Sequence, residues 1–203
     1  MELVWAGLLE ALRLIAAGDR VLLATTRFRA RALVNMLVNT GMGLPPVLVG
    51  LIVTMLLWRT GPLGALQLLY TPSAMVLAQL VIAAPIVTGL TLAAVQQIPE
   101  RFRLQILALG ASRLQMTWVL VKEARLPLLA AMMAGFGGVI SEVGASMMVG
   151  GNIKGDTRVL TTATVLETGK GNFDIAIALS VILLVITFLV NWALTWIQQR
   201  RRV

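Results

Sequence analysis

Residues 96–115 read QQIPERFRLQILALGASRLQ, and this is the longest stretch of the chain that is both charged and patterned as a helix. Phe102, Ile106 and Leu109 stand at positions i, i+4 and i+7, so they form one apolar stripe along a helix. Gly110 follows the stripe, and glycine readily takes the left-handed conformation that ends a helix. The stretch therefore predicts a helix that ends near residue 110.

A second helix is expected directly after this turn. Ser112 precedes Gln115 by three residues, which is the spacing of a capping box at a helix start. Pro99 suits the first position of the earlier helix, because a residue there needs no donor N–H. Together the two helices predict an amphipathic, basic helix–turn–helix hinge at a membrane surface. From the residues alone, an ordinary interfacial loop is the alternative.

The composition places the chain in a membrane. Of its 203 residues, 58% are hydrophobic and 13% are charged, and the mean hydropathy is +0.88. A soluble domain of this length could not bury so many apolar side chains. The formal charge of +8 indicates loops that face anionic lipid headgroups rather than nucleic acid. The sequence has no Cys and no His, which removes disulfides, thiolate chemistry and the commonest metal ligand.

Hydropathy predicts an all-α membrane protein built as a polytopic helical bundle. The apolar stretches that have about the 20 residues required by a bilayer core are residues 35–58, 73–95, 126–149 and 175–196. They belong to a transmembrane domain of residues 27–203. Glu2, Glu10 and Arg13 interrupt the apolar start of the chain, so residues 1–26 are expected to form an N-terminal interfacial segment.

The distribution of basic residues predicts the orientation of these spans. Basic residues precede the first span, follow the last, and are frequent in the loop of residues 96–125. In the connection after the third span, by contrast, Lys and Arg are balanced by Asp and Glu. The positive-inside rule therefore places loop 96–125 and the C-terminus in the cytoplasm.

Glu142 is the one acidic residue well inside a predicted span, and it has two interpretations. It can belong to a transport path or a proton relay. Alternatively, its carboxylate accepts hydrogen bonds from backbone N–H groups and braces a break in the helix. The second interpretation is favoured, because no second buried ionisable group is predicted to act as a relay partner. Pro45, Pro46 and Pro85 likewise predict kinks, either from packing or as part of a moving gate.

A short helix is predicted outside the membrane in the connection after the third span. It would cover residues 159–168, with Asp156 or Thr157 near its start and Gly169 just past its end. Thr161 and Thr162 supply hydroxyl groups. Such a helix can dip back towards the centre of the bundle, where irregular backbone is tolerated if it lines a cavity.

Residues for energy-consuming chemistry are not found in the sequence. The run Gly169-Lys170-Gly171 lacks the glycine spacing and the Ser or Thr of a phosphate-binding loop. Ser141 beside Glu142 is a poor nucleophile, since the chain has no His to activate it. We therefore expect a transport subunit that is not itself an enzyme, binds no cofactor, and depends on a separate ATPase that uses ATP and Mg²⁺. A secondary transporter and a purely structural membrane subunit are the alternatives.

Residues 108–115 (ALGASRLQ), followed by Glu123-Ala124-Arg125, resemble the cytoplasmic EAA loop of ABC-importer permeases. In that family, a short helix of this loop sits in a groove of the ATPase subunit and transmits its closure. The Glu-Ala-Ala triplet of the motif is replaced here by Leu104-Gln105-Ile106. The resemblance implies a set of ATPase-coupling residues: Arg103, Ala108, Leu109, Gly110, Ala111, Ser112 and Arg113.

Residues 136–153 (FGGVISEVGASMMVGGNI) resemble tungstate importer permeases more specifically, and molybdate permeases more loosely. The resemblance implies the type I ABC-importer permease fold and location in a bacterial or archaeal cell (inner) membrane. It also implies a homodimer that works with two ATPase subunits and an extracytoplasmic oxyanion-binding protein. Such permeases usually carry another span before residue 27, whereas residues 16–26 are too short to cross a bilayer, so that span is expected to be either shortened or missing from this sequence.

The resemblance further implies import of an oxyanion, most simply tungstate, by alternating access, with molybdate or another oxyanion as the alternative. The implied translocation or gate residues are Glu142, Asn152, Thr161 and Thr162. Lys154 and Arg158 are the expected cations at the outer mouth, where they would attract the anion or contact the binding protein.

Overall fold

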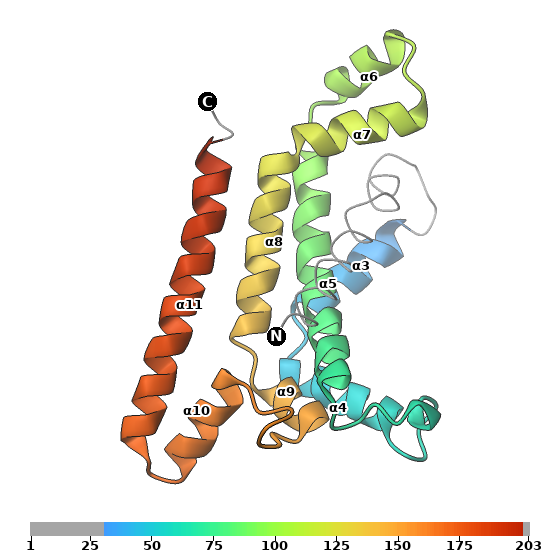
Figure 1. Cartoon of the computed structure of the whole chain (residues 1–203). Helices are drawn as coiled ribbons and strands as arrows, with labels where there is room; N and C mark the ends of the chain where they lie inside the picture. Colours follow the sequence, from blue (N-terminus) through green and yellow to red (C-terminus); the bar gives the residue numbers. More distant parts are fainter. Residues whose placement is uncertain (1–30, 201–203) are drawn as a thin grey trace.

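The computed structural model describes residues 31–200, and in this range the chain forms helices joined by turns and loops, with no β-strand (Figure 1). The all-α prediction is confirmed. In chain order the elements are α3 (Arg31–Met42), α4 (Pro46–Leu57), the short 3-10 turn η1 (Gly64–Leu66), α5 (Pro72–Gln96), α6 (Glu100–Ala108), α7 (Arg113–Glu123), α8 (Arg125–Ile140), α9 (Gly144–Gly150), α10 (Leu160–Gly169) and α11 (Phe173–Arg200). The predicted interfacial segment, residues 1–26, lies outside the described residues.

Among the described residues, two helices, α5 and α11, are each long and apolar enough to cross a membrane. They correspond to the predicted spans 73–95 and 175–196. Helix α5 begins where Thr71 accepts a hydrogen bond from the backbone N–H of Ala74, and Pro72 fills the first helical position. Pro85 lies inside α5, which continues past it as a single helix of 25 residues.

The predicted spans 35–58 and 126–149 are each broken into two helices, at Pro45-Pro46, where the sequence predicted a kink, and beside Glu142, where it predicted a helix break. Helices α3 and α4 meet at 106°, and α8 and α9 meet at 60°. The first break has a local cause, because Pro45 is extended (ψ 129°) ahead of Pro46, and a residue before proline disfavours the helical conformation. If each bent pair is one span, the described chain has up to four spans.

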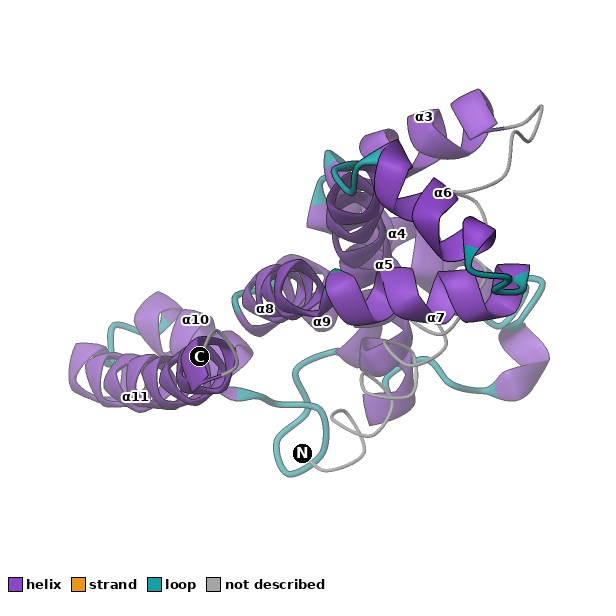
Figure 2. Cartoon of the chain, turned by 90° about the horizontal axis from the view of Figure 1, so that it is seen from above, coloured by secondary structure: helices purple, strands orange, loops and turns teal. Residues whose placement is uncertain are grey.

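Helix α5 is the centre of the bundle and packs against α3, α4, α8 and α9 (Figure 2). Buried side chains of α4, α5 and α9, including Val53, Ala78 and Val149, form the core between these helices. The backbones approach closely at Gly50, where a Cβ atom would lie 2.7 Å from Cα of Ala145. Small residues at such a crossing allow tight packing of membrane helices.

Helix α11 stands at one edge of the molecule with α10 beside it (Figures 1 and 2). In the most apolar part of α11, only 6% of the residues are buried by the rest of the described chain. Large apolar side chains such as Leu184, Phe188 and Trp192 are exposed along it. A surface of this kind faces lipid or another subunit.

Candidate functional site

Helices α6 and α7 form an elbow, defined here as residues 99–124, at the end of the bundle where α5 finishes and α8 begins (Figure 1). Gly110 has φ +82°, the left-handed conformation predicted from its place between the helices. The capping box is also confirmed: Ser112 Oγ accepts from Gln115 N at 3.3 Å, and Gln115 Oε1 accepts from Ser112 N at 2.8 Å. Pro99 is the N-cap of α6, whereas the sequence predicted it as the first residue of the helix, so α6 begins one residue later than expected.

The elbow has a small hydrophobic core that seats it on the end of α5. Val95 of α5 packs there with Ile106 of α6 and with Met116 and Leu120 of α7, all of them buried. Phe102 packs against the same cluster, so the predicted apolar stripe faces inward at Phe102 and Ile106. A movement of the elbow would therefore be transmitted to α5 through packed side chains.

Arg103 ties α6 to α5 by a hydrogen bond. Its Nη2 donates to the carbonyl oxygen of Val95 at 2.7 Å, in the last turn of α5. A cation at this place satisfies a terminal carbonyl and interacts favourably with the helix dipole. The guanidinium predicted for ATPase coupling is thus engaged within the chain.

Replacing Arg103 with Met should therefore lower the free energy of unfolding by about 1.5–3 kcal/mol, the range for a hydrogen bond to a charged group. Arg101 lies on the same helix but is exposed, so Arg101→Met is a matched control that should change stability by less than about 0.5 kcal/mol. Denaturant unfolding of both variants in micelles measures the difference. Equal stability of the two variants would show that the Arg103 contact is unimportant.

The outer surface of the elbow carries exposed apolar side chains. Leu109 is 87% exposed and Leu114 is 77% exposed, and they flank the turn at Gly110. Leu104 and Trp118 are also exposed. Of the other predicted coupling residues, Ala108, Ser112 and Arg113 are exposed and Ala111 is half-buried. An exposed apolar patch of this kind is typical of a protein–protein contact.

At the opposite end of the bundle, Glu142 braces the break between α8 and α9. Its side chain is buried, and Oε1 accepts a hydrogen bond from the backbone N–H of Ala145 at 2.6 Å. This is the bracing arrangement favoured from the sequence. Thr161 of α10 joins the same junction, because its Oγ1 donates to the carbonyl oxygen of Glu142 at 3.3 Å.

Asn152 links the end of α9 to α10. Its Nδ2 donates to the carbonyl oxygen of Thr162 at 3.5 Å, and Thr162 is fully buried. Arg158 donates two hydrogen bonds to Asn152: its Nε donates to the side-chain Oδ1 at 3.2 Å, and its Nη2 donates to the backbone carbonyl oxygen at 3.1 Å. The structure thus joins Asn152, Thr162 and Arg158 in one network. The guanidinium expected at the mouth is largely engaged in that network, whereas Lys154 is exposed.

Thr157 is a structural residue of this junction that the sequence suggested only as a possible helix start. It is 1% exposed, its Oγ1 donates to the carbonyl oxygen of Gly150 at 2.5 Å, and the same oxygen accepts from Ile153 N at 2.9 Å. Helix α10 begins three residues later, at Leu160, and Gly169 is its last residue. A threonine within a glycine-rich turn was the available signal, because Ser and Thr often bond to nearby backbone groups.

The turn between α10 and α11 carries a charged contact that is sensitive to pH. Hydrogen bonds from Asn172 and Lys170 lower the pKa of Glu167 from 4.5, and both bonds are 2.7 Å long. A lowered pKa stabilises the folded state above the ordinary pKa, and this contribution disappears as the pH falls through the folded value. Glu167→Gln should therefore lower the melting temperature slightly at pH 7 and have no effect once the carboxyl is protonated. A thermal melt at several pH values checks this.

Known proteins resemble this chain over most of its length. A family model described as "Binding-protein-dependent transport system inner membrane component" matches residues 15–203. A probable anion ABC transporter permease protein of Haloferax volcanii is 42% identical over 169 residues, which are 81% of this chain and 73% of that protein. The tungstate uptake system permease protein TupB of Peptoclostridium acidaminophilum is 39% identical over 174 residues (86% and 76%). The Campylobacter jejuni protein of the same name is 38% identical over 165 residues (81% and 69%).

Proposed function

Because the chain belongs to the family of inner membrane components of binding-protein-dependent transport systems, we propose that it is the membrane-spanning subunit of an ATP-driven oxyanion importer. Tungstate is the substrate that we propose first, since two relatives at 38% and 39% identity are tungstate permeases and a third, at 42%, is a probable anion permease. Molybdate or another oxyanion is the alternative. Such a subunit moves its substrate without an ATPase site of its own.

The proposal that an ATPase drives this subunit is based on the elbow. Its exposed surface at Leu109 and Leu114 is apolar, while its inner surface packs on α5. We assign the outer surface to a groove of the ATPase subunit, with ATP and Mg²⁺ bound by that partner. Closure of the ATPase would then move the elbow, and through Val95 and Arg103 it would move α5.

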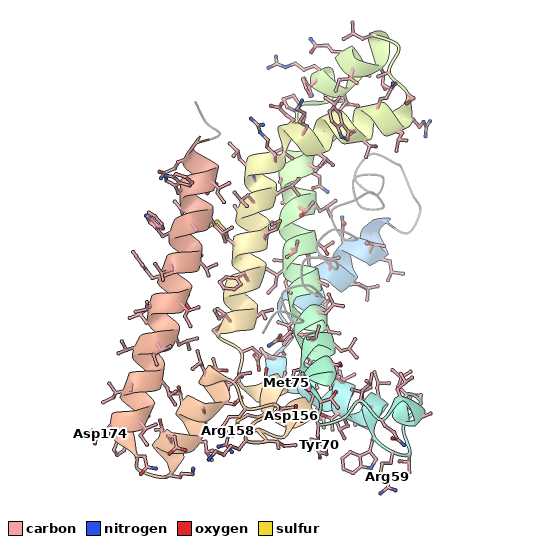
Figure 3. The ribbon with its side chains drawn as sticks, viewed as in Figure 1. Arg59, Tyr70, Met75, Asp156, Arg158 and Asp174 are labelled. Carbon is pink, nitrogen blue, oxygen red and sulfur yellow. The ribbon has the colours of Figure 1, made fainter. Side chains whose placement is uncertain are left out.

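The charge distribution supports a cytoplasmic elbow. Arg101, Arg113, Lys122 and Arg125 lie on or beside the elbow, and the C-terminal end of α11 is at the same end of the bundle (Figure 1). Figure 3 shows Asp156, Arg158 and Asp174 at the other end, and Lys154, Lys170 and Glu167 belong to the same connection. By the positive-inside rule the elbow and C-terminus face the cytoplasm of a bacterial or archaeal cell.

On the outer side, the network of α9 and α10 is suited to a gate rather than to tight anion binding. Arg158 is engaged by Asn152, and the hydroxyl of Thr161 donates to the backbone. We propose that an extracytoplasmic binding protein selects the oxyanion and docks at this end, where exposed Lys154 is available to either partner.

We also propose that two copies of the chain surround the path. Ala134, Gly137 and Ser141 follow one side of α8, and no described atom would lie within 4 Å of a Cβ atom on Gly137. Small residues at this spacing allow another membrane helix to approach closely. With the exposed surface of α11, they offer room for a second copy beside lipid.

Reconstitution tests the proposed function. The chain, its ATPase and its binding protein are placed in proteoliposomes, and internal tungsten and molybdenum are measured by mass spectrometry. We expect uptake of tungstate that requires ATP, the ATPase and the binding protein. Uptake that persists without any ATPase would show that the chain is a secondary transporter, and a preference for molybdate would select the alternative substrate.

A further inference from the structure

Tyr70 lies in the loop before α5 and makes two contacts with the end of α9. Its backbone N–H donates to the carbonyl oxygen of Val149 at 2.8 Å. Its ring covers Gly151, where a Cβ atom would lie 2.8 Å from the ring Cδ1. Figure 3 shows Tyr70 at the end of the bundle opposite the elbow. The two loops at this end are thus joined by one residue that the sequence did not single out.

Three residues of the joint adopt left-handed backbone conformations. Tyr70 has φ +65°, Gly151 has φ +71° and Asn152 has φ +51°. A residue with a side chain rarely adopts such angles, and it keeps them only where its surroundings determine them. Glycine and asparagine tolerate this region, so Tyr70 is the residue whose backbone is fixed by contacts rather than by local preference.

These contacts complete a brace at both ends of α9. The carboxylate of Glu142 holds the first turn of the helix, while Tyr70 and Thr157 hold the carbonyl groups of Val149 and Gly150. A Cβ atom at Gly150 would also lie 2.8 Å from Sδ of Met75, a residue at the start of α5. Helix α9 is therefore fixed against α5, and Asn152 follows two residues after its last turn.

We propose that Tyr70 is a positioning residue for transport. By holding the end of α9 against α5, it sets the place of Asn152 and of the α10 network at the outer end of the path. This proposal rests on the proposed function, because it states that Tyr70 holds the outer gate of the transporter in its closed position. Since 44% of Tyr70 is exposed, a protein that docks at this end can reach it and release the joint.

Two glycines of the same loop provide a matched test. Gly151 and Gly155 have φ +71° and +85°, so Ala introduces comparable backbone strain at both. A methyl group at residue 151 would collide with the Tyr70 ring, whereas one at residue 155 would have no described atom within 4 Å. Only Gly151→Ala therefore displaces the ring.

The experiment measures anion uptake and ATP hydrolysis of the full complex in proteoliposomes. We expect Gly151→Ala and Tyr70→Ala each to lower uptake per ATP by about tenfold, within the range of mutations that alter coupling between sites. Gly155→Ala should remain close to wild type. Tyr70→Phe should retain uptake, because ring carbons and the backbone N–H make the contacts. Once Tyr70 is Ala, adding Gly151→Ala should have little further effect.

Each outcome decides between the assignments. Equal uptake by Gly151→Ala and Gly155→Ala, or independent effects of Tyr70→Ala and Gly151→Ala, would overturn the role of Tyr70. If Gly151→Ala fails to assemble, the comparison of Tyr70→Ala with Tyr70→Phe still tests the proposal, since neither substitution adds atoms. Full uptake by Tyr70→Ala would then overturn the positioning role of Tyr70. Failure of the wild-type complex to import an anion would instead contradict the proposed function.

Discussion

Glu142→Gln should transport at a rate close to wild type, whereas Glu142→Ala should lose most of its uptake. The amide oxygen of Gln can still accept the hydrogen bond from Ala145 N, which is 2.6 Å long in the native chain. Ala removes the acceptor and leaves a buried N–H unpaired, which costs about 1–3 kcal/mol. Because 1.4 kcal/mol corresponds to about tenfold in an equilibrium, the bent arrangement of α8 and α9 would lose much of its population.

Uptake in proteoliposomes and unfolding in micelles, measured on both variants, separate the two interpretations of Glu142. A brace needs an acceptor, so uptake should follow the stability of each variant. A relay needs an ionisable group, so it would be lost in Glu142→Gln even where that variant folds as well as wild type. The latter result would contradict the brace and return Glu142 to the transport path.

Gly110→Val should uncouple ATP hydrolysis from uptake. Gly110 has φ +82°, and a side chain in the left-handed region costs about 1–2 kcal/mol, more for a β-branched residue. In the described chain no atom would contact a Cβ atom there, so the effect comes from backbone strain rather than from a collision. The turn should open and shift Leu109 relative to Leu114, which raises the number of ATP molecules hydrolysed per anion imported.

Gly110→Asn is the matched control, since Asn tolerates the left-handed conformation at helix ends. It should keep the ratio of hydrolysis to uptake near the wild-type value. Unchanged coupling in Gly110→Val would remove the turn from the mechanism. Equal loss in the Val and Asn variants would indicate that an added side chain, not the backbone angle, disturbs the contact.

The parts of the structure that the sequence predicted are those with local causes. The capping box of Ser112 and Gln115 joins residues three apart, and Gly110 takes its φ from its place between two helices. Hydropathy placed α5 and α11 because a bilayer requires long apolar segments. The short helix α10 was found within one residue of its predicted bounds for the same reason, since its start and end signals are local.

The remaining features depend on partners that sequence spacing does not show. The angles of 106° and 60° at the two breaks depend on how the half-helices pack, as at the close approach of Gly50 and Ala145. The resemblance to importer permeases implied an ATPase-coupling role for Arg103, and Arg158 was expected as a cation at the outer mouth. Their actual acceptors, the carbonyl of Val95 and the side chain and carbonyl of Asn152, became visible only in the folded chain.

Cysteine crosslinking tests most directly whether the elbow is the contact for a separate ATPase. The sequence has no Cys, so a single Cys can be placed at Leu109, which is 87% exposed, or at Phe188, which is 64% exposed on α11. In membranes that contain the complete complex, a reagent with a maleimide at one end and a photoreactive group at the other should join Cys at residue 109 to the ATPase, in a yield that changes with ATP, and should not join Cys at residue 188. Absence of the ATPase from every crosslink formed at residue 109, while the complex still hydrolyses ATP and imports the anion, would contradict the account.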